Sequence, residues 1–304
     1  MRVPTPTHAD VQRSRIVLAF AAVYLIWGST YLAILFAIET LPPLLMIGSR
    51  FLVAGIILYI VVRARDAAKP TREQWLHASL IGVMLLTCGT GVVVWAEERV
   101  ASGIAALLVS VVPLWMVLID WLRPRGVRPS RWVIAGVIVG LAGLWILADP
   151  LAEGGNGNLV VEAFLMLASF SWAAGSVYAK HAPLPESKFL TTAIEMLAGG
   201  TVLILAGLVT GELSAFHPAA VSTKSWMALL YLIVFGSLIA FSAYVWLVHA
   251  VSPALLSTYA FVNPVVAVFL GWALASEPIT VRTLVAAAII IGGVALITIG
   301  RRDE

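Results

Sequence analysis

The sequence predicts an all-α polytopic membrane protein with ten transmembrane helices, arranged as two inverted five-helix repeats. Three observations support this prediction: a low charge content, recurring apolar runs of about 20 residues, and tryptophans that recur at fixed spacings. Of the 304 residues, 61% are hydrophobic and 12% are charged, whereas soluble domains are about 25% charged. This composition excludes a soluble enzyme, a disordered chain and a nucleic-acid-binding protein.

Charge, cysteine content and missing motifs exclude further kinds of binding site. The net charge of +3 does not indicate nucleic acid, because membrane proteins keep Lys and Arg in their cytoplasmic loops. The single cysteine, Cys88, excludes an internal disulfide and any multi-cysteine metal site. No phosphate-binding G-x-x-x-x-G-K-[ST] motif occurs. We therefore expect neither a cofactor nor a metal.

Apolar runs long enough to cross a bilayer follow one another along the chain. Helices are expected, because backbone groups in lipid must be satisfied within the segment, and the runs are too long for barrel strands of about ten residues. The fifth run is short. The ten predicted spans are 16–37, 43–62, 75–96, 102–122, 132–148, 159–180, 188–209, 226–248, 253–274 and 281–300.

Basic residues set the expected orientation. With the N-terminus in the cytoplasm, the inside segments carry 15 of the 19 Lys and Arg residues and the outside segments carry three. Cytoplasmic loops are enriched in Lys and Arg. Both termini are therefore expected in the cytoplasm.

An internal repeat is visible in the tryptophans. Trp27 and Trp172 differ by 145 positions, and three further pairs differ by 151. Those three pairs are Trp75 and Trp226, Trp95 and Trp246, and Trp121 and Trp272. The predicted halves are residues 1–150 and 151–304, each with five spans. An odd number of spans inverts the second half, a common plan of secondary transporters, with the site between the halves.

Several stretches resemble a known family. They are LIWGSTYLAI (25–34), PPLLMIGSRFLVAGI (42–56), ASGIAALLVSVVPL (101–114), GLAGLWIL (140–147), SFSWAAGSVYAK (169–180), AIEMLAG (193–199) and VSPALLSTYAFVNPVVAVFLGW (251–272). In this order they resemble the ten-helix EamA-type exporters of the drug/metabolite transporter superfamily. The resemblance implies a bacterial inner-membrane protein that exports small metabolites, often amino acids, or amphiphilic drugs, driven by an ion gradient. It also implies a central cavity, with the fifth and tenth helices at the periphery.

Two charged residues lie inside apolar spans, at positions related by the 145-residue offset: Arg50 and Glu195. Intramembrane charges face a bundle interior or an aqueous cavity and are functional by default. We expect Arg50 to hold a substrate carboxylate, and Glu195 to bind either a substrate amine or a coupling proton. Glu97, at the end of the third span, is a further candidate for receiving a proton. The alternatives are a structural role for the buried pair and a solvated helix end for Glu97.

Two prolines recur at the 151-residue offset, Pro113 and Pro264, each within a predicted span. A proline frees the carbonyl four residues earlier and bends the helix. A hinge or shaping role is expected, with a static kink as the alternative. Just before the second proline, Tyr259 and Asn263 are predicted to bind substrate, although interhelical hydrogen bonding would explain them equally.

Aromatic and hydroxyl residues deep in the first and sixth spans complete the predicted substrate site: Tyr24, Trp27, Trp172 and Ser176. Aromatic walls suit apolar or cationic ligands. Core packing is the alternative.

The leading functional hypothesis is a secondary exporter that exchanges protons for small solutes by alternating access. Its partners are a small-molecule substrate, the lipid bilayer and the proton. An uncoupled facilitator, an importer, an intramembrane enzyme and a membrane scaffold are the alternatives. The enzyme is disfavoured because H-E-x-x-H and G-x-S-x-G motifs are absent. Gly136 and Gly140 permit close helix contact, within the chain or in a weak homodimer.

Overall fold

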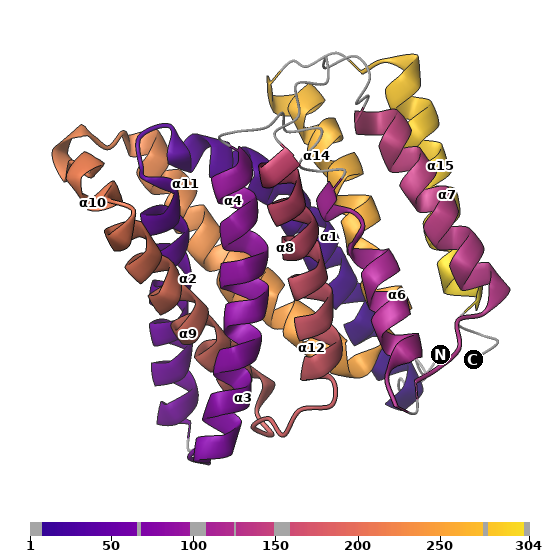
Figure 1. Ribbon diagram of the computed structural model, residues 1–304, viewed down its shortest axis with the longest axis horizontal. Coiled ribbons are helices and arrows are strands. Elements are labelled where there is room, and N and C mark those ends of the chain that lie inside the picture. Colours follow the sequence, from indigo (N-terminus) through magenta and orange to yellow (C-terminus); the bar gives the residue numbers. More distant parts are fainter. Residues whose placement is uncertain are drawn as a thin grey trace, which may run out of the picture.

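A computed structural model describes residues 8–65, 68–97, 108–124, 126–148, 159–275 and 279–300. Throughout these ranges every regular element is helical. The helices pack side by side as one bundle, with the connections at its two ends (Figure 1). This confirms the predicted all-α polytopic fold.

Eight segments are long and apolar enough to cross a membrane. Val112–Leu122 and Arg131–Leu147 are shorter apolar helices at the positions of the predicted fourth and fifth spans. Residues 98–107 lie outside the described part, so the count of ten remains a prediction. The elements are α1 (His8–Ile38), α2 (Pro43–Ala64), α3 (Arg72–Gly82), η1 (Val83–Gly91), α4 (Val92–Glu97), α6 (Val112–Leu122), α7 (Arg131–Ala148), α8 (Leu159–Ala179), α9 (Lys188–Val209), α10 (Glu212–Ala215), η2 (Pro218–Ala220), α11 (Thr223–Tyr231), η3 (Leu232–Phe241), α12 (Ser242–Ala250), α13 (Pro253–Leu256), α14 (Tyr259–Ala275) and α15 (Val281–Gly300).

Capping residues fix where several helices begin. Thr71 precedes α3 and forms a reciprocal capping box with Gln74, which satisfies two backbone donors at once. Ser187, Ser222 and Ser252 accept backbone hydrogen bonds at the starts of α9, α11 and α13. These short polar signals interrupt an otherwise apolar sequence and separate the spans.

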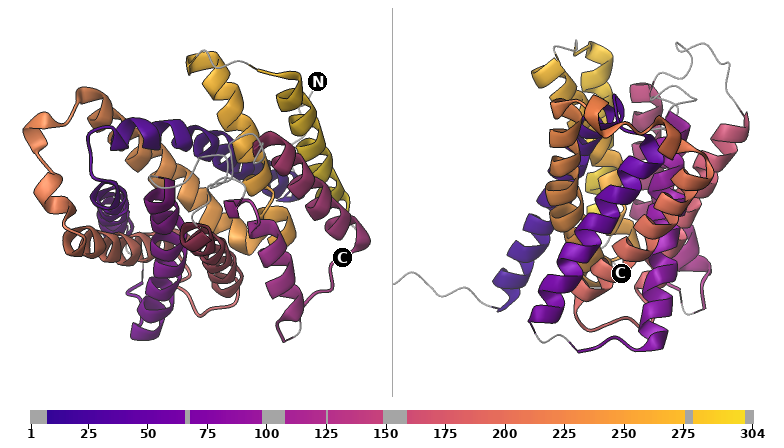
Figure 2. Two further views of the ribbon diagram at one scale, coloured as in Figure 1. Left: turned by 45° about the horizontal axis from the view of Figure 1, so that its top comes forward. Right: turned by 90° about the vertical axis from the view of Figure 1, so that its left-hand side faces the viewer.

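Glycines bring two helix pairs into close contact. A Cβ at Gly55 of α2 would lie 2.9 Å from the backbone nitrogen of Leu197 in α9. A Cβ at Gly136 of α7 would lie 2.7 Å from the carbonyl oxygen of Gly293 in α15. Small residues allow such approach of backbones. The α2–α9 and α7–α15 pairs lie on opposite sides of the bundle (Figures 1 and 2).

The α7–α15 contact bears on two predictions. It places these helices at the edge of the bundle, as the resemblance implied (Figure 2). Gly140 also packs inside the chain, because a Cβ there would lie 2.8 Å from the ring of Phe261. Both glycines therefore serve packing within the chain.

The third and eighth spans each contain a π-helical segment, η1 and η3, at matching places in the two halves. Such segments are rare and recur at functional sites. Carbonyl oxygens in both accept side-chain hydrogen bonds from the other half: Ser171 donates to Met84 (2.9 Å) and Trp27 donates to Gly236 (3.1 Å). Their sequences are continuously apolar and do not distinguish them from α-helix.

The two prolines differ in their setting, which corrects the prediction for one of them. Pro113 lies in the first turn of α6 and not within a continuous helix. A proline there removes an N–H that has no intrahelical partner anyway. Pro264 does lie inside α14. The carbonyl that it frees, on Ala260, accepts a hydrogen bond from Ser110 (3.3 Å).

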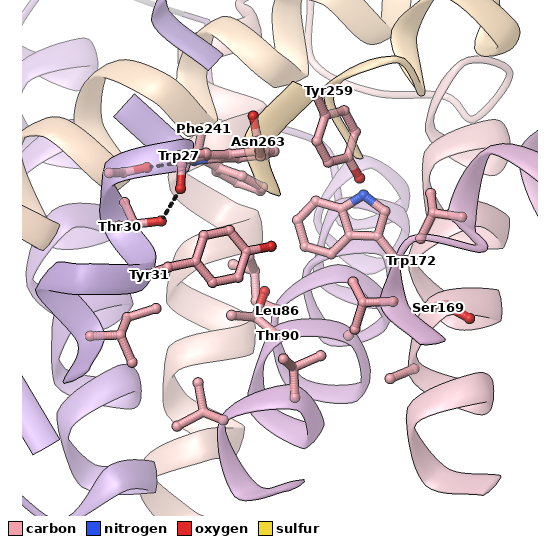
Figure 3. A pocket seen from close by; sticks show the side chains of 18 of the residues that line it. Trp27, Thr30, Tyr31, Leu86, Thr90, Ser169, Trp172, Phe241, Tyr259 and Asn263 are labelled. Atoms are coloured by element: carbon pink, nitrogen blue, oxygen red, sulfur yellow. Dashed lines mark hydrogen bonds between the residues drawn. The ribbon is translucent and has the colours of Figure 1, made fainter. Parts of the chain in front are cut away.

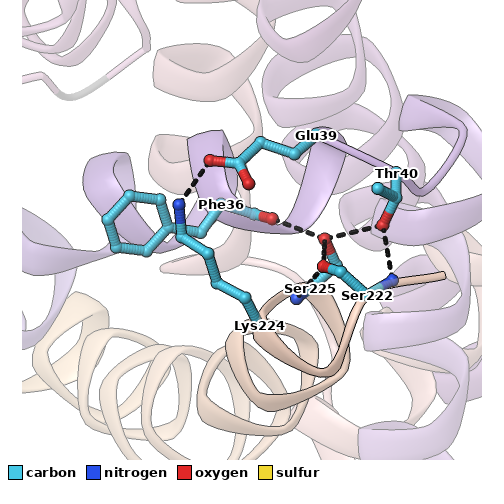
Figure 4. A network of polar contacts seen from close by, with 6 residues as sticks. All are labelled: Phe36, Glu39, Thr40, Ser222, Lys224 and Ser225. Atoms are coloured by element: carbon cyan, nitrogen blue, oxygen red, sulfur yellow. Dashed lines mark hydrogen bonds and ion pairs between the residues drawn. The ribbon is translucent and has the colours of Figure 1, made fainter.

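Polar contacts join the end of α1 to the start of α11 (Figure 4). Buried Ser225 donates to the carbonyl oxygen of Phe36 (2.8 Å) and accepts from Thr40 (2.8 Å). Lys224 forms an ion pair with Glu39 (2.5 Å) over the Phe36 ring. These contacts, here called the α1–α11 junction, connect the two halves at the end of the bundle opposite to the start of α1.

Candidate functional site

A cavity lies inside the bundle between the two halves (Figure 3). Its empty volume is about 860 Å³, part of it open to the exterior. α1, α2, η1, α4, α6, α8, η3 and α14 all contribute to its wall. The lining extends to Ile34 of α1 and Val94 of α4, toward the end of the bundle where these two helices end.

Aromatic side chains form one wall of the cavity. Trp27 is the centre of this group, here called the aromatic layer, which comprises Trp27, Trp172, Phe241, Tyr244 and Tyr259. The Trp27 ring lies 5.8 Å from Trp172, 5.1 Å from Tyr244 and 5.3 Å from Tyr259, between ring centroids. Trp172 and Tyr259 point toward the space that Tyr31 also faces (Figure 3). The contacts of Trp27 with Trp172 and Tyr259 are edge-to-face, and such contacts stabilise a fixed arrangement.

Hydrogen bonds from residues outside the cavity lining hold the aromatic layer in place. Ser176 donates to the carbonyl oxygen of Trp172 (2.7 Å), so the Tyr244 hydroxyl donates to Ser176 (2.5 Å) and accepts from the Trp172 indole (2.9 Å). Tyr24 contacts Thr258 (2.5 Å). Neither Tyr24 nor Ser176 is among the described residues around the cavity, and their binding of substrate stays a prediction.

Arg50 lies in the cavity wall, 4% exposed. Its Nε donates to Ser237 of η3 (2.9 Å), and its Cζ lies 5.0 Å from the centre of the Phe51 ring. Within the described chain, its terminal nitrogens Nη1 and Nη2 make no hydrogen bond and its guanidinium has no carboxylate partner. The guanidinium is therefore positioned by the protein and left with unused donors.

Glu195 occupies the repeat-related position but a different environment. It is 1% exposed and lies outside the cavity lining, and neither of its carboxyl oxygens has a hydrogen-bond partner among the described residues. Its backbone packs directly against Gly82 of α3. The partner of Arg50, Ser237, corresponds at the 151-residue offset to Leu86, which offers no polar group. Arg50 and Glu195 do not pair with each other.

Of the remaining predicted residues, some line the cavity and others do not. Asn263 lines the cavity, 3% exposed, and with its amide nitrogen turned inward it donates to the carbonyl oxygens of Tyr259 (3.2 Å) and Tyr24 (3.3 Å). Pro113 and Pro264 are not among the described lining residues. Glu97 ends α4, and its side chain lies outside the described part. The structure thus brings together Trp27, Arg50, Trp172, Tyr259 and Asn263 around one cavity.

Sequence reasoning missed three residues that shape this site: Tyr31, Ser237 and Tyr244. Tyr31 lines the cavity, Ser237 holds Arg50, and Tyr244 supports both tryptophans. The available signal was polarity within otherwise apolar spans. It is weak, because hydroxyl groups in a membrane can be satisfied by neighbouring helices without any functional role.

Comparison with known proteins supports one family. The sequence pattern of the EamA-like transporter family matches residues 14–148 and again residues 159–299. The chain is 42% identical over 286 residues to the inner membrane transporter YedA of Escherichia coli (strain K12), covering 93% of this chain and 90% of that protein. It is 27% identical over 274 residues to Protein PecM of Dickeya dadantii (strain 3937), covering 90% and 88%.

A solved crystal structure shares the fold, with a TM-score of 0.78 at 21% identity, and the match covers 96% of this chain and 98% of that one. The family match extends over both halves of the bundle and includes the helices that build the cavity. The chain therefore belongs to the EamA-like transporter family and is a membrane transporter.

Proposed function

We propose that this protein exports small metabolites across the bacterial inner membrane by alternating access, with proton antiport through Glu195. Its relative YedA is named an inner membrane transporter, which supports that location. The excess of Lys and Arg in the loops near the start of α1 supports cytoplasmic termini. In that orientation, the end of the cavity lined by Ile34 and Val94 would lie toward the outer side of the membrane.

The aromatic layer and its hydrogen bonds form the closed inner end of the transport path. Lys180, at the end of α8, adds a hydrogen bond to the carbonyl oxygen of Val251 (2.8 Å) at this end. Inverted repeats exchange conformations when a transporter changes the side to which it opens. An exchange here would close the outer mouth and open the inner end.

The observation that carries proton coupling is the unpartnered carboxyl group of Glu195. A charged carboxylate at this buried position would be costly, because neither oxygen has a donor, and a bound proton removes that charge. After the exchange of conformations, Glu195 would hold the cavity position that Arg50 holds now. Water reaching it from the cytoplasm would let the proton leave, which links proton release to inward opening.

Efflux from proteoliposomes tests this function. Vesicles preloaded with a panel of aromatic acids, amino acids and amines are assayed with and without an inward proton gradient. We expect gradient-stimulated efflux in the wild type and in the control Glu186→Gln, whose side chain is exposed in the α8–α9 loop. In Glu195→Gln the stimulation is lost, while exchange of substrate across the membrane persists.

The possible results separate the alternatives. Equal stimulation in Glu195→Gln and the wild type would reject coupling through this residue. Efflux that ignores the gradient in every variant would indicate a facilitator. Uptake that the gradient drives, without efflux, would indicate an importer.

A further inference from the structure

The described lining of the cavity carries a positive charge and no negative charge. Arg50 is the one charged side chain among its described lining residues, and no aspartate or glutamate joins it. The polar groups nearby are neutral, as in Thr30, Thr90, Ser169 and Asn263. A ligand that enters therefore meets a single fixed positive charge.

Arg50 is held so that its outer edge remains available. Ser237 binds Nε, and Phe51 lies beside the guanidinium. A Cβ at Gly236 would lie only 2.5 Å from Nη2, so the absence of a side chain there makes room for the group. A planar guanidinium with two free nitrogens binds a carboxylate through two parallel hydrogen bonds.

The rest of the wall suits an apolar body. Trp27, Trp172 and Tyr259 present rings, and Leu86 and Val112 present aliphatic side chains. Rings of this kind also attract cations. Here a cation would meet repulsion from Arg50, which is stronger beside the low-dielectric protein interior than in bulk water.

On the basis of the transport function proposed above, we propose that the cavity selects carboxylates with an apolar body of aromatic size, bound by Arg50 through Nη1 and Nη2. The class does not require an ammonium group, because no carboxylate is present among the described lining residues to bind one. Cationic amphiphiles are excluded from the substrate range. Export of an anion from a negatively charged cell interior is favoured about 50-fold per charge at 100 mV, so this class fits the outward direction.

Four compounds with the same phenyl-and-ethylene body isolate the charged groups. They are 3-phenylpropanoate, phenylalanine, 2-phenylethylamine and the neutral 3-phenylpropanamide. Calorimetric titration into purified protein in lipid nanodiscs gives each dissociation constant without any gradient. The variants are Arg50→Gln, Arg50→Lys and the control Arg131→Gln, whose guanidinium lies over Trp132 at the start of α7, away from the cavity.

In the wild type and in Arg131→Gln, 3-phenylpropanoate should bind at least about 10-fold more tightly than the amide, and the amine should bind most weakly. Arg50→Gln should reduce the preference for the acid over the amide to within about twofold, since the charge that distinguishes them is gone. Arg50→Lys should retain part of the preference, because lysine keeps the charge but not the paired donors. This conservative variant keeps the test informative if the glutamine variant does not fold.

Three results would overturn the proposal. They are amine binding as tight as acid binding in the wild type, an unchanged acid preference in a folded Arg50→Gln, and phenylalanine binding 10-fold more tightly than 3-phenylpropanoate. The last result would require an ammonium site. Gradient-driven efflux with no acid preference would reject only this inference, and an acid preference without gradient-driven efflux would reject only the proposed coupling.

Discussion

Gly236 of η3 lies against the guanidinium of Arg50, and its replacement by alanine is a sensitive test of how that group is positioned. The added Cβ would lie 2.5 Å from Nη2 and 3.2 Å from Cζ. Ordinary contacts need about 3.5 Å, so the guanidinium must move by about 1 Å. Charge-assisted hydrogen bonds require about 2.7–2.9 Å, and a shift of this size breaks one of the two proposed bonds to a carboxylate.

The expected cost falls on binding and not on folding. A hydrogen bond to a charged group contributes about 1.5–3 kcal/mol, which corresponds to about 10- to 150-fold weaker binding of 3-phenylpropanoate. The atoms that must move are the far end of a flexible side chain, so we expect the free energy of unfolding to change by less than about 1 kcal/mol, within the range of helix propensities. Calorimetric titration and thermal unfolding measure the two quantities on the same sample.

Gly292→Ala in α15 is the matched control, because a Cβ there meets no atom within 4 Å. It should leave binding unchanged and raise or preserve stability. The reasoning is refuted if Gly236→Ala binds 3-phenylpropanoate within about twofold of the wild type. It is also refuted if this variant loses several kcal/mol of stability, since that would mean the backbone and not the guanidinium had moved.

Two further predictions concern stability. Tyr244→Phe removes the acceptor of the half-buried Trp172 indole and the donor to Ser176, and we expect a loss of about 1–3 kcal/mol in thermal unfolding. An unchanged midpoint would show that the aromatic layer needs no hydrogen bonds. Ser225→Ala breaks the α1–α11 junction by leaving the Phe36 carbonyl without its donor, and should cost about 1–2 kcal/mol. The two sites share no contact, so the double variant should lose the sum, and strong coupling between them would contradict a separate role for each.

Much of the fold is encoded in local composition. Apolar runs bounded by charged or capping residues predicted where the spans lie, because a segment in lipid must satisfy its own backbone and exclude charge. The recurrence of Trp27 at Trp172 predicted two related halves, and both tryptophans lie in the aromatic layer. The π-helical segments had no such signal, since their sequences read as continuous apolar helix.

The candidate site was predicted in part. Sequence alone marked Arg50 and Glu195 as equivalent members of a repeat. Their environments differ in the structure, because Arg50 lies in the wall of the cavity, whereas Glu195 lies outside the described lining and packs against Gly82. Tyr24 and Ser176 were predicted as ligands from their depth and residue type, and in the structure they lie outside the described lining. The direction of a side chain around its helix depends on neighbours that neither depth nor residue type specifies.

The sequence by itself determined that this protein folds in a lipid bilayer, that it is helical, and that its two halves are related in sequence. These follow from the cost of placing charge and unpaired backbone in hydrocarbon, a cost that each segment carries independently. Only the tertiary structure decided that Arg50 lines the cavity with unused donors while Glu195 is packed without a partner. That difference arises from contacts between residues more than a hundred positions apart, such as Arg50 with Ser237, and no local pattern contains them.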